Sequence, residues 1–361
     1  MTSVPLRDGS VPWRWFGTVG LLVPLAVLAC CAVIASLAIG ASAVPSRTVI
    51  AALLGGDVAA RDAAIVLQLR LPRTLLGFGV GAALAVSGTM MQGLFRNPLA
   101  DPALIGISSG AALAAVAVIV LGVPALAAGM LGPFSLPLAA FLGSVCTTLL
   151  VQRIARGGHV QGGQGRTGGT DVATLLLAGI AISAIASAAT GYLVFGSDDR
   201  QMRDITFWTM GSIGGATWTT VLGLAPFALG AVLAAGRWAG VLDALLLGER
   251  EAALLGFRVE PAKRGIVIVA AAAVGASVAV AGVIGFVGLV VPHLVRLMAG
   301  AGHGRLLPAS ALLGGTLLVC ADIVARTVVA PAELPIGLVT ALLGGPFFLW
   351  LLIRRRRELS P

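Results

Sequence analysis

Apolar stretches of about 20 residues recur along this chain, and they constrain its fold more than any other feature. Each is long enough to cross roughly 30 Å of hydrocarbon as a helix. Of the 361 residues, 58% are hydrophobic and 11% are charged, and the mean hydropathy is +1.01. Strand-like alternation is absent, and backbone groups in lipid must be bonded within their own segment. The sequence therefore predicts an all-α polytopic membrane protein, with residues 1–361 forming a single transmembrane domain.

Hydropathy predicts about ten spans, and the boundary between the seventh and eighth is the least clear. The predicted spans are residues 16–40, 71–95, 102–121, 134–154, 172–195, 218–235, 265–283, 285–300, 306–325 and 335–353. With both termini cytoplasmic, most basic residues and the formal net charge of +9 fall on the cytoplasmic side, as the positive-inside rule requires. Topology alone explains this charge, and no continuous basic surface indicates nucleic-acid binding.

Small residues concentrate in the second predicted span, which carries Gly77, Gly79, Gly81 and Gly88. Such residues let helices approach backbone to backbone in lipid. A polar break at 96–98 ends this span, and Asp101-Pro102 is a helix-start signal for the next one. A close-packed, broken helix pair is typical of proteins whose helices slide past one another, which indicates transport.

A weak internal repeat links the second span to the seventh at one constant offset. Gly81, Ala82, Ala85, Val86, Gly88 and Pro98 recur as Gly275, Ala276, Ala279, Val280, Gly282 and Pro292. The step covers an odd number of spans, so the two copies have opposite orientations. An inverted repeat of spans 2–5 and 7–10 is typical of transporters.

The sequence contains no nucleotide-binding motif and no recognisable set of catalytic residues. The glycine-rich segment 157–170 contains no GxxxxGK[ST] pattern, and the only lysine is Lys263. The three histidines lack metal-ligand spacing, so no metal site is predicted. Asp322, an ionisable candidate within a span, lies four residues before Arg326, where an i,i+4 ion pair explains it. We therefore expect a non-enzyme with no permanently bound cofactor, and any ATP hydrolysis must occur on another polypeptide.

Energy could enter through residues 237–264, the longest polar segment predicted on the cytoplasmic side. Leucines and alanines alternate there with charged residues, which predicts two short amphipathic helices separated by Gly248 and stopped at Gly256. An apolar knob with a charged rim suits a cleft in a soluble partner. The alternative is a helix lying on the lipid surface.

At this point the chain resembles the FecCD-type permease subunits of type II ABC importers for iron-siderophore complexes, haem and vitamin B12. The resemblance covers nearly the whole chain. It is carried by RLPR (70–73), GAALAVSGTMMQGLFRNPLADPALIGISSGAA (81–112), TFWTMGSIGGATW (206–218), LLLGEREAALLG (245–256), GFVGLVVPHLVRL (285–297), ADIVAR (321–326) and ELPIGLVTALLGGPFFLWLL (333–352).

The resemblance implies partners and residue roles. Two copies of the permease form a dimer around the import path, and two cytoplasmic ATP-binding subunits engage the coupling segment. That segment comprises Leu247, Gly248, Glu249, Arg250, Glu251, Ala252, Ala253 and Gly256. A periplasmic binding protein docks on Arg70, Arg73 and Arg326, for which interfacial anchoring is the alternative role. The path and its gate are expected near Leu99, Asp171, Val172, Phe207 and Trp208. The location implied is the bacterial inner membrane, with lipid around the spans.

The segment FWTMGSIGGATW (207–218) most resembles haem permeases, so haem is the expected transported substrate and its binding protein the expected periplasmic partner. Ferric siderophore and vitamin B12 remain alternatives. A secondary carrier that works without an ATPase is the alternative from another class.

Overall fold

The computed structural model describes residues 13–40, 44–122, 132–156 and 172–359, and within these ranges it consists of helices and connecting turns without a strand. All ten predicted spans coincide with helices. These are α1 (Trp13–Ala38), α4 (Leu71–Leu94), α5 (Ile107–Leu121), α7 (Ser135–Arg156), α8 (Val172–Phe195), α10 (Trp218–Leu245), α12 (Val259–Ala281), α13 (Val287–Ala299), α14 (His303–Thr327) and α15 (Ile336–Leu359).

Seven helical segments of the described chain are long and apolar enough to cross a membrane, and three shorter apolar helices complete the set of ten. The shorter ones are Ile107–Leu121, Val287–Ala299 and Ile336–Leu351. At 1.5 Å per residue, the 13 residues of α13 extend only about 20 Å. The eighth predicted span is therefore a helix too short to cross the hydrocarbon by itself.

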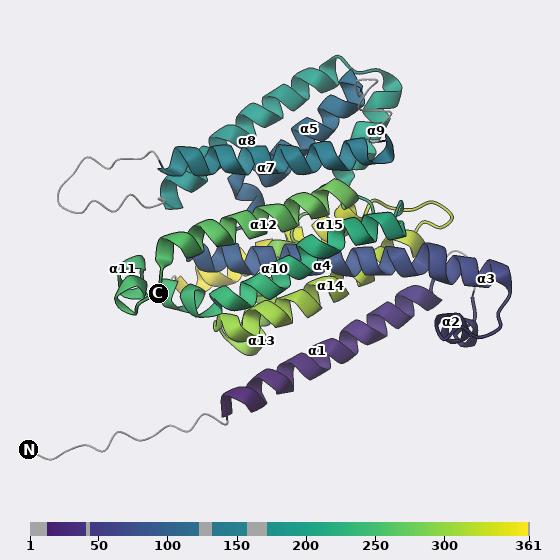
Figure 1. Cartoon of the computed structure of the whole chain (residues 1–361), viewed down its shortest axis with the longest axis horizontal. Helices are drawn as coiled ribbons and strands as arrows, with labels where there is room; N and C mark the ends of the chain where they lie inside the picture. The colour runs from purple at the N-terminus through teal and green to yellow at the C-terminus, as the bar shows by residue number, and fades with distance from the viewer. Residues whose placement is uncertain (1–12, 41–43, 123–131, 157–171, 360–361) are drawn as a thin grey trace, which may run out of the picture.

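The helices form three groups that lie side by side (Figure 1). In the view shown, α5, α7 and α8 lie at the top, α4, α10 and α12 in the middle, and α1, α13 and α14 below. A short helix, α11 (Glu249–Leu254), projects at one end of the bundle, which we call the α11 end. The opposite end carries α2 (Ser46–Leu53), α3 (Ala60–Ala64) and α9 (Asp199–Met210).

Helix α4 is the centre of the core, and α10, α12, α13 and α14 all pack against it. Glycines permit the closest approaches. A Cβ at Gly81 would collide with the backbone carbonyl of Gly314, and one at Gly88 with the carbonyl of Gly288. The predicted backbone-to-backbone packing of this span is confirmed at these two positions.

The helix contacts repeat in the two halves of the chain as an inverted repeat requires. Helix α4 packs on α14, and its counterpart α12 packs on α7. Likewise α5 packs on α7, and α13 packs on α14. In each half a long helix is followed by a non-helical turn and then a short helix, with left-handed backbone at Gly106 in one turn and at Gly282 and Phe286 in the other.

Two boundaries differ from the sequence prediction around α4. Helix α4 begins at Leu71 as predicted, but the continuous helical segment begins earlier, because a π-helical turn (Ile65–Arg70) joins α4 to α3 and extends the segment back to Ala60. The predicted helix start at Asp101-Pro102 opens only a 3₁₀ turn, Pro102–Ile105, whose first free N–H, that of Ala103, donates to Asp101 Oδ1 at 2.8 Å. Helix α5 begins later because Gly106, at φ +81°, interrupts the helical backbone.

The prediction of two short helices in residues 237–264 is wrong. The first half of the segment is the end of α10, which continues without a break to Leu245. Only α11 is a separate short helix, and α12 begins at Val259. Gly248 (φ +133°) and Gly256 (φ +87°) flank α11 and adopt backbone conformations that other residues rarely adopt.

Candidate functional site

The three arginines predicted as docking residues lie together at the end of the bundle opposite α11. Arg73, in the first turn of α4, donates to Asp322 of α14 at 2.8 Å and to Glu333 at 2.9 Å. Arg326 lies 3.5 Å from the second oxygen of Asp322, which is an ion-pair distance. The i,i+4 pair predicted for Asp322 and Arg326 therefore exists, but Arg73 is the closer partner.

These guanidinium groups are bound within the protein rather than displayed on its rim. Arg70 and Arg326 are 5% and 6% exposed. Arg70 donates to the carbonyls of Leu37 and Ala38 at 2.7 and 2.9 Å, which ties α4 to the end of α1. Arg326 donates to the Ser36 carbonyl at 2.7 Å and to its Oγ at 2.8 Å. Three helices are thus joined by one charged network, and its exposed member is Glu333, at 46%.

The α11 end presents an apolar surface around a polar anchor. Leu247, Leu254 and Leu255 are 69%, 88% and 62% exposed, while Ala252 is fully buried and holds the helix against the bundle. Glu249, Arg250 and Glu251 form the first turn of α11, and the Glu251 carboxylate lies so close to Gly248 that a Cβ there would collide with it. The predicted apolar knob with a charged rim is present in this one helix.

Lys263 anchors α11 to the start of α12. Its Nζ lies 2.9 Å from both carboxylate oxygens of Glu249 and 3.0 Å from Glu260. The lysine side chain is 4% exposed, whereas the two glutamates are 41% and 30% exposed. Sequence reasoning missed this cluster. The Glu260–Lys263 spacing of three residues was a usable signal, but the Glu249 contact depends on the tertiary turn at Gly256.

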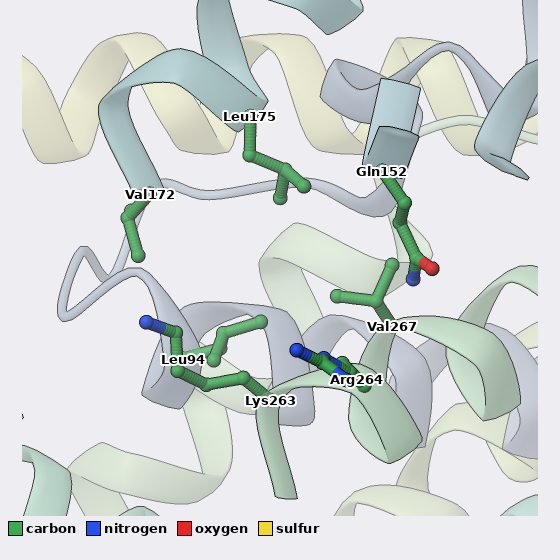
Figure 2. Close-up of a pocket in the computed structure, with 7 residues that line it drawn as sticks. All are labelled: Leu94, Gln152, Val172, Leu175, Lys263, Arg264 and Val267. Atoms are coloured by element: carbon green, nitrogen blue, oxygen red, sulfur yellow. The ribbon is translucent and has the colours of Figure 1, made fainter. Parts of the chain in front are cut away.

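A small cavity lies beside Lys263, where four helices meet at the α11 end. Figure 2 shows its lining residues, which come from the end of α4, the last turns of α7 and the beginnings of α8 and α12. They are Leu94, Gln152, Val172, Leu175, Lys263, Arg264 and Val267. Val172, predicted as a gate residue, is therefore at a junction of helices from both halves of the chain.

The other predicted path residues are dispersed. Leu99 lies in the turn after α4, where its N–H donates to Asn97 Oδ1 at 2.9 Å. Asp171 lies outside the described residues. Phe207 and Trp208 belong to α9, at the end opposite α11, where Phe207 is 63% exposed and Trp208 packs partly against the core. The structure thus places Val172 at the same cavity as Lys263, which binds Glu249 of the coupling segment, whereas Phe207 and Trp208 lie at the other end.

Nothing in the described part of the chain gathers three or more His, Cys, Asp or Glu side chains in a metal-binding arrangement. Met90 and Met91 are fully buried in α4 and pack in the core. The arrangement instead provides close backbone contacts between helices, a charged cluster at one end and an apolar projection at the other.

A bundle of this kind, with its inverted repeat, short helices and projecting α11, defines a multi-pass membrane permease. Residues 27–354 match the model of the FecCD transport family, and the chain belongs to this family. It is an ABC importer permease of the FecCD type. The family implies ATP-binding partner subunits and a permease dimer.

Curated relatives and one solved structure support this assignment. The chain is 49% identical over 303 residues to the hemin transport system permease protein HmuU of Yersinia pestis, covering 81% of this chain and 84% of that one. It is 45% identical over 296 residues to the cobalamin import system permease protein BtuC of Halobacterium salinarum, covering 81% and 74%. A solved structure described as an inward-facing conformation of a metal-chelate type ABC transporter matches with a TM-score of 0.80 at 32% identity, covering 93% of this chain and 99% of the other.

Proposed function

We propose that the chain is the permease subunit of an ATP-driven importer that moves haem from the periplasm to the cytoplasm across the bacterial inner membrane. The observation that carries the choice of haem is the 49% identity to a hemin permease, together with the FWTMGSIGGATW segment at residues 207–218. The exposed Phe207 and the partly buried Trp208 lie in this segment, and aromatic rings suit a flat aromatic ligand. The import path then runs along the interface of two copies.

The α11 end faces the cytoplasm in this proposal, and two ATPase subunits receive α11 in surface clefts. An exposed row of leucines beside a charged first turn is the surface that a helix-in-groove contact uses. A periplasmic haem-binding protein docks at the opposite end. The carboxylates of that partner compete with Asp322 and Glu333 for the arginine cluster.

Reconstitution tests the substrate. The permease, its co-encoded ATPase and its binding protein are placed in liposomes and supplied with haem, a ferric siderophore or cobalamin. We expect haem alone to stimulate both uptake and ATP hydrolysis. Cobalamin-stimulated uptake without a response to haem would transfer the assignment to vitamin B12, which the 45% identity to a cobalamin permease keeps as the second candidate.

A second experiment tests the dependence on the ATPase. The double variant Glu251→Lys, Gly256→Pro disrupts α11 and its glycine joint. We expect it to abolish ATP-driven uptake, whereas transport by a carrier that needs no ATPase would persist.

A further inference from the structure

The chain's only lysine occupies a mechanical junction that the coupling function leaves without an assigned role. Helix α11 has six residues and is joined to its neighbours through Gly248 and Gly256. Both glycines have a positive φ, +133° and +87°. Glycines at both ends give a short helix freedom to swing. A push on α11 reaches the membrane helices only if something ties α11 to them.

Lys263 supplies a tie of this kind. Its ammonium group bridges Glu249, the first residue of α11, and Glu260, in the first turn of α12, at 2.9 and 3.0 Å. The lysine side chain is only 4% exposed, so its end of each ion pair is shielded from water, although the two glutamates are partly exposed. Shielded pairs are screened by salt less than exposed ones.

The same residue contacts the point where the inner ends of the helices meet. The aliphatic part of Lys263 lines the cavity together with Leu94 of α4, and with Val172 and Leu175 at the start of α8 (Figure 2). A displacement of α12 therefore changes its packing against α4 directly, and it changes the shape of the cavity that the start of α8 also lines.

We propose that Lys263 is a positioning residue that makes α11 and the first turn of α12 one rigid unit, so that force on α11 is delivered through α12 to α4 and α7, against which α12 packs. This inference rests on the proposed function, since it requires an ATPase subunit to act on α11. Lys263 touches neither nucleotide nor substrate. It acts through Glu249 and Glu260.

The test compares uptake per ATP hydrolysed in liposomes that contain the complete complex. Lys263→Met keeps the aliphatic stem in the cavity and removes the bridge. We expect uptake per ATP to fall about fivefold or more, the lower range of a typical coupling energy, while the ATPase subunits remain bound. Lys263→Arg, which can also bridge two carboxylates, restores most of the ratio. The matched control is Arg258→Gln, an exposed cation just before α12.

A charge exchange separates the bridge from the lysine itself. Glu249→Lys alone places two ammonium groups together and lowers the ratio. Glu249→Lys combined with Lys263→Glu restores the pair and raises the ratio again, provided that Glu260→Gln removes the repulsion between the new carboxylate and Glu260. A ratio in Lys263→Met equal to that of Arg258→Gln would overturn the proposal. Loss of the ATPase subunits from Lys263→Met would do the same, because it would make Lys263 part of the docking surface.

Amine labelling gives a readout that a merely structural role would not move. Because the sequence has one lysine, peptide mapping after treatment with an amine-reactive reagent reports Lys263 specifically. We expect the Lys263 amine to be protected from the reagent in both the resting and the nucleotide-bound complex. In the Glu249→Gln, Glu260→Gln variant we expect Lys263 to be labelled. Labelling of the unmodified complex during turnover would contradict a rigid link. A wild-type complex that imports no metal chelate with ATP would instead refute the proposed function.

Discussion

Arg73 and Asp322, separated by 249 positions in the sequence, form a bidentate ion pair that joins α4 to α14. The carboxylate is 2% exposed and also faces Arg326. A carboxylate that balances two arginines at a helix junction affects both the stability of the bundle and the charge available to a partner.

Removing this carboxylate destabilises the permease. Asp322→Ala leaves the nearly buried Arg326 without a carboxylate partner and Arg73 with Glu333 alone, and breaking a buried ion pair costs about 3–5 kcal/mol. Thermal unfolding of the detergent-purified protein measures the change. Arg326→Met combined with Asp322→Leu replaces the buried pair by apolar packing, leaves Arg73 on Glu333 and recovers most of the loss. If the double variant were as unstable as the single one, the ion pair would not be the source of the effect.

We expect Glu333 to affect the proposed docking at this cluster. It is the exposed partner of Arg73, so Glu333→Gln frees one face of that guanidinium for an acidic partner. We expect faster association of the periplasmic binding protein and a steeper dependence on salt, because charges at the edge of an interface act mainly on association rate. Reversal of Arg73 and Arg326 to Glu slows association. Stopped-flow binding at two ionic strengths measures both, and unchanged rates in the reversed variant would remove the docking assignment.

The glycine contact between α4 and α13 does not tolerate a methyl group. Gly88→Ala places a Cβ against the Gly288 carbonyl, and such overpacking costs about 1–3 kcal/mol. Gly230→Ala on α10 is the matched control, because no atom lies within 4 Å of its Cβ position. Replacing that glycine stabilises its helix by about 0.5–1 kcal/mol. Thermal midpoints of the two variants should move in opposite directions.

We expect the exposed leucines in and beside α11 to form the proposed contact with the ATPase subunits. Leu254→Ala removes a side chain that is 88% exposed in the isolated chain, and we expect the affinity for the ATPase subunits to fall at least about tenfold. Leu233→Ala on the exposed face of α10, at 77%, is the control and leaves the affinity unchanged. Co-purification and titration of the ATPase subunits check the difference. Equal affinities in both variants would place the coupling contact elsewhere.

Asp101 caps the 3₁₀ turn before α5, and burial raises the pKa of its carboxyl. A raised pKa means that the folded state binds this proton more tightly than the unfolded state does. The free energy of unfolding therefore falls as pH rises from the pKa of Asp101 in the unfolded chain to its pKa in the folded protein. Asp101→Asn keeps the capping oxygen and removes the charge, and we expect equal or greater stability at pH 7. Asp101→Ala loses the cap and costs about 0.5–2 kcal/mol. Unfolding at pH 4 and pH 7 tests the order.

Most of the fold could be predicted from patterns within single segments of the sequence. Ten apolar segments, the close packing at Gly81 and Gly88, and the glycine joints of α11 were all predictable, because hydropathy and glycine chemistry act along the chain. The end of α10 was mistaken for a separate helix because the sequence turns amphipathic where the helix leaves the apolar region, without a breaker before Gly248.

Contacts between distant segments were not predictable in the same way. The sequence indicated that Arg70, Arg73 and Arg326 share one end, but their burial depends on Ser36 and Asp322, which only packing brings near. Glu249 and Lys263 are likewise joined by a turn whose direction is set by Gly256. Charge patterns therefore located both ends of the molecule but not their partners.

The 28 residues of α10 give it a length of about 42 Å, against roughly 30 Å of hydrocarbon. Its first residue, Trp218, donates its indole N–H to the Leu67 carbonyl at 3.0 Å, at the end of the bundle where an aromatic ring suits the headgroup layer. If Trp218 lies at one headgroup layer, we expect the last turns of α10 to extend beyond the acyl chains on the other side. A soluble subunit can then bind the exposed leucines that follow α10 without displacing lipid.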